Sequence, residues 1–278
     1  MNDRGLRSRD GARLATIACV AGLVEPSLDQ ILAFCAEDPV ERVFLEDSAR
    51  RRLGRFRGLE RGARLSALCH LGANVVPSGQ GCGIFAEAAG SGQARMLIGE
   101  EGAVTELWEE ARGRLPPPRE DRPGQPVFVI DELPAAGETG LRPATLEDLE
   151  RLVPACAAAH ELELGVDPLA RDADAFRWRT QAQIEEGRSW VWADQGRILF
   201  KAEASAWTPR AVQVQQVWVD PEVRGGGYGQ RGMRDLCRFL LERVPTVCLF
   251  VRRENEPAIR VYEAIGMRRT ITYRSVLF

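Results

Sequence analysis

The sequence is poor in lysine and histidine, with a single lysine, Lys201, and two histidines, His70 and His160, in 278 residues. Arginine supplies the rest of the 37 basic residues, but 40 acidic residues outnumber them and the formal net charge is -3. Nucleic-acid binding needs a basic patch or stripe, so we expect no nucleic-acid partner. Because imidazoles are scarce and the seven cysteines contain no C-x-x-C pair, we expect no metal site.

Long hydrophobic runs are also missing, and a membrane-spanning helix needs about 20 apolar residues. Several arginines precede the apolar stretch 14–24, which imitates the start of a signal peptide, but Glu25-Pro26 follows where small residues should mark a cleavage site. We therefore expect stretch 14–24 to form a first β-strand. We also expect no membrane partner and, because the cysteines are scattered, a reducing cytoplasm.

The length predicts two domains, and a content of 45% hydrophobic and 28% charged residues is typical of globular chains. The strongest break in composition is the segment 115–126, LPPPREDRPGQP, whose five prolines disfavour a helix or a central strand. A second loose stretch covers 133–140. We therefore place a boundary near residue 138, between domains 1–138 and 139–278.

Periodicity and turn residues predict an α/β (α+β) chain with a mixed sheet flanked by helices. In the first half we expect helices over 27–37, 39–52 and 100–112 and strands over 64–71, 74–76 and 95–98. In the second half we expect helices over 145–160, 174–186, 229–244 and 256–264. Strands are expected there over 141–143, 189–193, 197–204, 212–219, 246–251, 267–273 and 276–278.

Two motifs in the second half indicate chemistry. In the first, a strand over 212–219 leads into glycines that open a helix, where free backbone N–H groups and the helix dipole favour a phosphate. It has the form R-x-x-G-x-G, with Arg224, Gly227 and Gly229. The second, N-x-x-A-x-x-x-Y-x-x-x-G-M, runs from Asn255 to Met267. Together they resemble the GCN5-related N-acetyltransferases (GNAT superfamily).

Segments 163–168, 200–203 and 213–219 of the second half, and 38–40 and 72–77 of the first, resemble a bacterial subgroup that fuses a poorly characterised N-terminal domain to a C-terminal GNAT domain. The resemblance implies a GNAT fold and acetyl-CoA as cosubstrate. It implies that the pantetheine arm pairs with the backbone of Val217, Trp218 and Val219. The pyrophosphate would bind at Arg224, Gly225, Gly226, Gly227, Tyr228 and Gly229. Asn255 would contact the cofactor, and Tyr262 would stand near the thioester sulfur.

Each implied contact has a purely structural alternative. Asn255 is a good helix N-cap, Tyr262 could be a packed core aromatic, and Arg224 could be a solvated loop residue. The glycines could simply form a tight turn.

The implied reaction moves acetyl from acetyl-CoA to a primary amine, of a protein lysine or a small metabolite, by direct attack in a ternary complex. A lysine-like amine must first lose a proton, which costs roughly 4.6 kcal/mol at pH 7. Many family members use a glutamate on the long strand, where this chain has Gln215 and Gln216. We expect Glu203 on the neighbouring strand to act as the base, unless it is a surface carboxylate or the partner of Lys201. Tyr262 is expected to protonate the CoA thiolate.

Other readings stay open. The replacement by Gln215 and Gln216 is compatible with a catalytically weak or inactive acyl-CoA sensor, and a third possibility is a structural partner protein. His160, with Glu161 and Glu163, ends a helix that is either a solvated terminus or an acceptor contact. Cys82 is a weaker candidate, as an exposed nucleophile.

The first half is expected to be a degenerate GNAT-like copy that binds no CoA. We expect Gly99-Glu100-Glu101-Gly102 to stand in the place of its pyrophosphate loop. Two glutamates there would repel phosphate.

Overall fold

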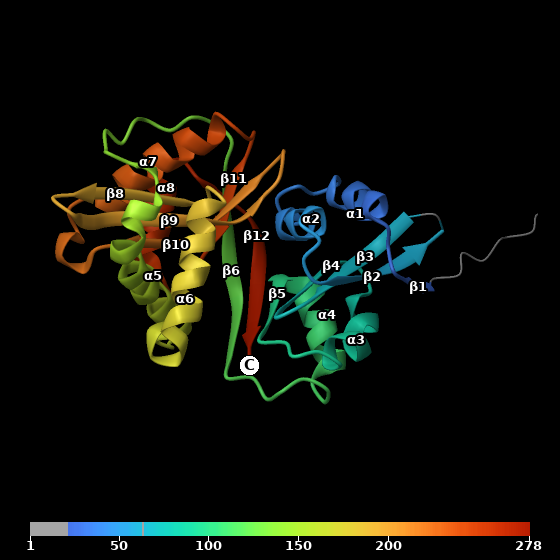
Figure 1. The fold of residues 1–278 in the computed structure, drawn as a ribbon. Helices are drawn as coiled ribbons and strands as arrows, with labels where there is room; N and C mark the ends of the chain where they lie inside the picture. Colours follow the sequence, from blue (N-terminus) through green and yellow to red (C-terminus); the bar gives the residue numbers. More distant parts are fainter. Residues whose placement is uncertain (1–21, 63) are drawn as a thin grey trace, which may run out of the picture.

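The computed structural model describes residues 22–62 and 64–278 and shows one hydrogen-bonded mixed sheet with helices on both faces (Figure 1). The strands are β1 (Gly22–Val24), β2 (Arg55–Arg61), β3 (Arg64–Leu71), β4 (Asn74–Gly79), β5 (Met96–Glu100), β6 (Glu120–Ile130), β7 (Arg142–Pro143), β8 (Ser189–Asp194), β9 (Arg197–Trp207), β10 (Val212–Val219), β11 (Val247–Phe250) and β12 (Arg268–Leu277). Their order across the sheet is β1-β2-β3-β4-β5-β12-β6-β11-β10-β9-β8-β7. This confirms the predicted α/β class.

The helices are α1 (Leu28–Cys35), α2 (Val43–Arg50), α3 (Ala86–Gly90), α4 (Glu101–Ala111), α5 (Leu149–Leu164), α6 (Pro168–Glu185), α7 (Tyr228–Leu241) and α8 (Glu256–Ala264), with short 3-10 turns η1 (Cys82–Phe85), η2 (Leu146–Asp148) and η3 (Pro221–Val223). Local sequence explains several of the boundaries. Ser27 caps α1 through a capping box with Gln30, and Pro168 opens α6 behind the Asp167 cap.

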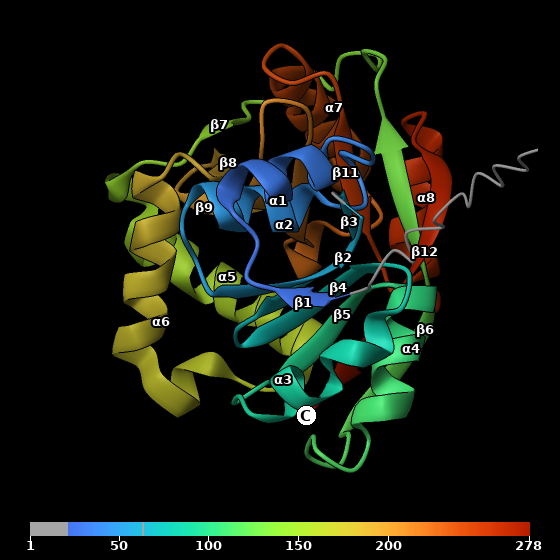
Figure 2. The same ribbon diagram turned by 90° about the vertical axis from the view of Figure 1, so that its right-hand side faces the viewer.

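The two halves repeat one order of elements: a short strand, two helices, three strands, a glycine-containing turn into a helix, a strand, a helix and a final strand. In the first half, α1 and α2 pack on one face of the sheet and α3 and α4 on the other (Figure 2). In the second half, α5 and α6 cover one face, and α7 and α8 pack against the other around Phe200 and Leu236. The fold therefore shows the expected tandem arrangement of two similar halves.

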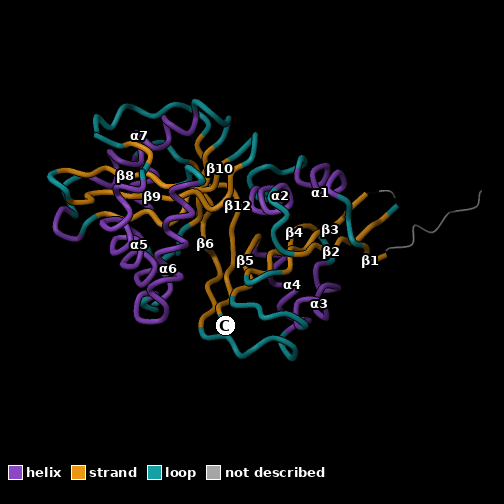
Figure 3. Tube along the Cα trace, viewed as in Figure 1, coloured by secondary structure: helices purple, strands orange, loops and turns teal. Residues whose placement is uncertain are grey.

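The final strands of the two halves are exchanged. β6 ends the first half but pairs with β11 of the second, whereas β12 ends the second half and pairs with β5 of the first. The two strands also pair with each other and run side by side through the middle of the molecule (Figure 3). The expected boundary near residue 138 falls in the loop between β6 and β7.

The prediction that prolines exclude a central strand from 115–126 was wrong, because β6 begins at Glu120. Its pairing with β12 shifts register near Pro123 and again near Pro126, and bulges tolerate a missing N–H group. β11 pairs only with Val127–Ile130, so the proline-containing part of β6 has a partner strand on one side alone.

Two further expectations were wrong, and a third concerns residues that lie mostly outside the described ranges. The closing strands 267–273 and 276–278 are one strand, β12. Most of the expected strand 14–24 lies outside the described residues; β1 covers its last three positions. Segment 99–102 does not replace the pyrophosphate loop, because Glu100 caps α4 and thus matches Asn255 before α8. The turn that matches by element order follows β4, at 79–83.

Candidate active site

A slot opens between the two parallel strands in the middle of the second half. β10 and β11 are in register only at Val212–Val247 and Gln213–Cys248, after which the strands separate. On its other side, β10 shifts register against β9 between Gln215 and Trp218, and Gln216 adopts a left-handed backbone with φ of 52°. Such a bulge redirects the strand, so the edge of β10 from Val217 onward faces the slot.

The glycine loop continues from the end of β10. Gly227 precedes α7 with φ of 78°, and a Cβ built there meets nothing within 4 Å, so the backbone angle rather than crowding favours glycine. No intramolecular hydrogen bond from the N–H groups of Gly227, Tyr228 or Gly229 is found among the described residues. First-turn N–H groups without partners, at the positive end of a helix dipole, form a cradle for an anion.

The other predicted cofactor residues lie around this loop and slot. Val217, Trp218 and Val219 line the slot, and the Trp218 indole Nε1 is buried with no partner in the described part of the chain. Arg224 donates from Nε to the carbonyl of Val219 at 3.2 Å, and Gly225 adjoins it. Gly226 N–H donates to the Val223 carbonyl, so this group is already used inside the turn.

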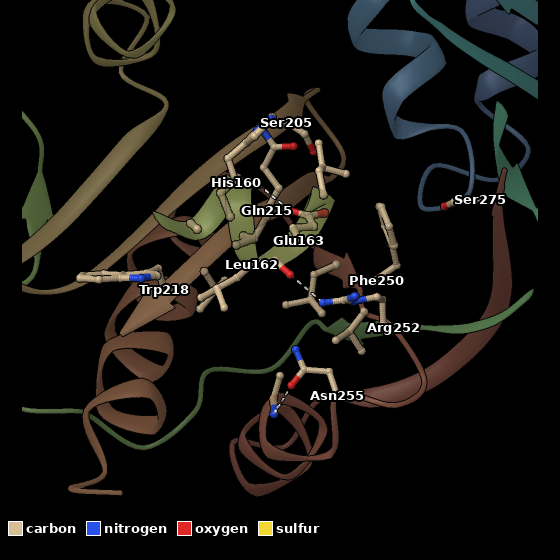
Figure 4. Close-up of a pocket in the computed structure, with 18 of the residues that line it drawn as sticks. His160, Leu162, Glu163, Ser205, Gln215, Trp218, Phe250, Arg252, Asn255 and Ser275 are labelled. Carbon is tan, nitrogen blue, oxygen red and sulfur yellow. Dashed lines mark hydrogen bonds between the residues drawn. The ribbon is translucent and has the colours of Figure 1, made fainter. Parts of the chain in front are cut away.

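Two of these residues also have structural duties. The Tyr228 ring stacks on Trp192 at 4.8 Å between centroids, while its backbone N–H has no partner among the described residues. Asn255 accepts a hydrogen bond from Ala258 N–H at 3.3 Å and so caps α8. Figure 4 shows Asn255 at the start of this helix, beside the slot. Capping does not prevent a ligand contact, because an exposed amide retains free donors.

Tyr262 lies on α8 with its ring 5.6 Å from Phe128, between centroids, and borders the slot. Burial raises the pKa of its hydroxyl above the ordinary value, and the nearby charges of Glu163 and Cys237 raise it further. The hydroxyl therefore keeps its proton at neutral pH. A protonated phenol here can donate to a thiolate but cannot serve as a base.

Glu203 is held in a buried ion pair. Its side chain accepts hydrogen bonds from Lys201 Nζ at 2.8 Å and from Cys156 Sγ at 3.2 Å, and the residue is only 4% exposed. Burial alone would raise the pKa of Glu203, but the charges of Lys201 and Arg179 outweigh it and the pKa falls to about 2. A carboxylate held this firmly in its ionised form is a poor proton acceptor.

Glu163 borders the slot, whereas the sequence predicts only a helix end that is either a solvated terminus or an acceptor contact. It lies in the last turn of α5 and accepts a hydrogen bond from the Gln216 amide at the bulge. Burial raises the pKa of Glu163, although Arg122, Lys201 and Arg252 act in the opposite direction. Its charge is felt at Tyr262, so acid and base candidates share one site. The only local signal was a carboxylate just before the Gly165 C-cap.

A continuous cleft of about 2290 Å³ joins these elements. It extends from the glycine loop past Glu163 to β4 and β5 of the first half, so both halves line it. In Figure 4, Leu162, Glu163 and Arg252 occupy its middle, and Ser275 of β12 borders it on the side of the first half. This volume exceeds the roughly 300–1,000 Å³ of a typical small-molecule pocket.

The weaker candidates, Cys82 and His160, form no catalytic group together. Cys82 is buried, and burial raises the pKa of its thiol to about 12, which disfavours a nucleophile. His160 lines the cleft with its ring 5.8 Å from that of Phe176. Within 22–62 and 64–278, no group of three or more His, Cys, Asp and Glu residues is arranged to hold a metal ion. No helix in the same ranges is long and apolar enough to cross a membrane.

Comparison with known proteins agrees with this geometry. Residues 155–267 match the model of the acetyltransferase (GNAT) family, and residues 54–152 match a domain of unknown function, DUF4081. Proteins named mycothiol acetyltransferase, from Mycobacterium sp. strains JLS and MCS, are each 28% identical over 201 residues. The match covers 64% of this chain and 65% of each relative, slightly less than two thirds of their length.

Solved structures share the fold at low sequence identity. A GNAT-family acetyltransferase from Colwellia psychrerythraea has a TM-score of 0.58 at 12% identity, covering 93% of this chain and 99% of that one. A GCN5-related N-acetyltransferase from Sphaerobacter thermophilus has a TM-score of 0.57 at 16% identity, covering 92% and 94%. A tandem GNAT protein from the clavulanic acid biosynthesis pathway has a TM-score of 0.54 at 16% identity, covering 92% and 98%. By these matches, residues 155–267 of the chain are similar to the GNAT family of acetyltransferases, and residues 54–152 are similar to the DUF4081 domain.

Proposed function

We propose that the chain transfers the acetyl group of acetyl-CoA to a primary amine, with Glu163 as general base and Tyr262 as general acid. The observation that carries the proposal is the position of both side chains at one slot, which leads directly into an open anion cradle. The pyrophosphate would bind at Arg224 and the N–H groups of Gly227, Tyr228 and Gly229. The pantetheine arm would pair with the free edge of β10 at Val217–Val219.

The proton path uses Glu163 and Tyr262. A Glu163 carboxylate with a raised pKa is a stronger base than an ordinary carboxylate and can accept the amine proton, directly or through water. The free amine attacks the thioester carbon, the C–S bond breaks, and the thiolate takes a proton from Tyr262. Gln216 holds Glu163 toward the slot through its amide. Direct attack needs no covalent enzyme intermediate.

We infer that Glu203 is not the base. Its carboxylate neutralises Lys201, which is fully buried, and this pair stabilises the layer between α5 and β9. Removing one partner of a buried ion pair costs about 3–5 kcal/mol. The alternative that Glu203 is the partner of Lys201 is therefore the better interpretation.

A small-molecule amine is the acceptor that we favour over a protein lysine. The support is the name of the curated relatives, mycothiol acetyltransferase. We further infer a reducing compartment, the cytoplasm, because the six described cysteines are free and buried. The sensor alternative is weakened by a carboxylate with a raised pKa in the slot, since a sensor has no need of a base.

The test is release of free thiol from acetyl-CoA in the presence of a panel of amines, with Glu163→Gln and Glu203→Gln compared. We expect Glu163→Gln to lower kcat by about a hundredfold or more while cofactor affinity and the melting temperature stay close to wild type. Glu203→Gln should instead lower the melting temperature. Turnover in Glu163→Gln close to that of the wild type would show that Glu163 is not the base. If the wild type releases no thiol in the presence of any amine, the sensor alternative is favoured.

The pH dependence gives a second readout. Glu163 accepts a proton only when ionised, so kcat/KM should rise with pH through its pKa. Because burial raises that pKa, the acid limb should lie above the ordinary carboxylate range. The limb should vanish in Glu163→Gln. A wild-type limb that persists in this variant would assign it to another group.

A further inference from the structure

The exchanged strand β6 brings a residue of the first half to the catalytic base. Arg122 lies on the part of β6 that borders the cleft, where β12 is its partner strand on one side. Its side chain is 9% exposed, and Nη2 contacts the Glu120 carboxylate at 2.5 Å. An arginine so enclosed keeps one orientation, because its neighbours restrict the rotamers.

The guanidinium of Arg122 holds the end of the helix that carries Glu163. Its Nη2 donates to the Glu163 carbonyl oxygen at 2.8 Å. Arg252, which follows β11, donates to the preceding carbonyl, that of Leu162, also at 2.8 Å, as the dashed line in Figure 4 marks. The last carbonyl groups of a helix have no intrahelical partners, and cations are favourable there. Arg122 from strand β6 and Arg252 from the loop after β11 therefore fix the last turn of α5.

The charges around the Glu163 carboxylate come from several elements. Arg122 faces it from β6, Lys201 from β9 and Arg252 from the loop after β11. Gln216 of β10 donates to it, and Tyr262 of α8 is close enough to feel its charge. Arg122 is the first among the cations that oppose the effect of burial. It is thus placed to set both the position and the acidity of the carboxyl group.

We propose that Arg122 is a positioning residue for Glu163, so that the DUF4081 half of the chain completes the active site of the GNAT half. The proposal rests on the proposed function, since it requires Glu163 to be the base. It gives the first half a catalytic contribution through one buried side chain, without a cofactor of its own. It also predicts that the exchange of β6 and β12 matters for turnover as well as for stability.

The experiment compares Arg122→Met and Arg122→Lys with a matched control, Arg274→Met. Arg274 lies on β12 and is similarly enclosed, since its side chain is 13% exposed. It pairs with Asp121, the neighbour of Arg122 on β6, but its hydrogen bonds reach neither Glu163 nor Leu162. Full pH profiles of kcat and KM are measured with acetyl-CoA and the acceptor amine. Melting temperatures are recorded for every variant, so that activities are compared only under conditions where each variant is folded.

In Arg122→Met we expect kcat to fall about tenfold or more, with the KM for acetyl-CoA little changed, because a small misplacement of the base is costly. The acid limb should move to higher pH, because a positive charge that favours the ionised carboxylate is gone. Arg122→Lys retains the charge, so its limb should stay close to wild type and its kcat should recover in part. Arg274→Met should leave the limb unmoved.

An unmoved limb in Arg122→Met, or equal losses of kcat in Arg122→Met and Arg274→Met, would overturn the proposal. This failure differs from failure of the base assignment. If the acid limb disappears in Glu163→Gln but is unchanged in Arg122→Met, Glu163 is the base and Arg122 does not position it. If the limb persists in Glu163→Gln, both fall together.

Discussion

The two halves carry the same turn after the same strand, but only one turn is open. After β10, Gly227, Tyr228 and Gly229 line the cleft, and their N–H groups have no intramolecular partner among the described residues. After β4, the N–H groups of Gly81 and Cys82 both donate to the Glu106 carboxylate at 2.8 Å. The first half thus fills its anion cradle with a side chain of its own. Glycine spacing alone does not make a phosphate site; free donors do.

The strands before the turns differ as well. β10 shifts register against β9 at the Gln216 bulge, whereas β4 pairs with β3 without a shift from Val75 to Gly79. Seven positions after the helix cap, the second half has Tyr262 and the first half has Leu107. The first half therefore lacks the redirected strand and the hydroxyl in addition to the open cradle.

The largest effect is expected from closing the anion cradle of the second half, which Gly227, Tyr228 and Gly229 form. Gly227→Glu places a carboxylate where the pyrophosphate should bind, and we expect acetyl-CoA affinity to fall about a hundredfold or more, by analogy with Glu106 in the first half. Calorimetry measures the loss. Gly187→Glu is the matched control, because Gly187 also has a positive φ, 68°, and open space around its Cα. If both variants lose binding equally, backbone strain rather than the cradle is responsible.

The second half has a hydroxyl group at Tyr262 where the first half has Leu107, and Tyr262→Phe tests what this hydroxyl contributes. Tyr262→Phe keeps the ring against Phe128, so the fold should persist, while kcat falls about tenfold or more because the thiolate loses its proton donor. Single-turnover release of thiol measures this step. Turnover at the wild-type rate would make Tyr262 a packed core aromatic and nothing more.

The smallest effect is expected from emptying the first cradle. Glu106→Ala removes one acceptor shared by two N–H groups at a solvent-exposed position, so we expect a loss of about 1 kcal/mol in unfolding free energy. Chemical denaturation measures it. Acetyl-CoA stoichiometry should not change, because β4 has no bulge. A second bound cofactor in this variant would show that Glu106 alone closes the site.

Local features of the site could be predicted from the sequence. The glycine loop, the Asn255 cap and Tyr262 each stand in a local sequence motif, and both motifs lie within the residues 155–267 that match the GNAT family model. Helix α8 (Glu256–Ala264) was predicted to the residue for the same reason.

Tertiary features could not be predicted. Glu163 meets Gln216 only because α5 packs on β10, and Arg122 reaches Glu163 only because β6 crosses into the other half. The prolines of β6 argue against a central strand unless the bulges and the open side of the strand are known. Glu106 closes its turn from a helix about 25 residues further along the chain.

The central claim is that one chain has one open cofactor cradle, and calorimetric titration with acetyl-CoA tests it most directly. We predict one molecule bound per chain in the wild type and in Glu106→Ala, and none in Gly227→Glu. Two molecules bound to the wild type, or undiminished binding in Gly227→Glu, would contradict the account.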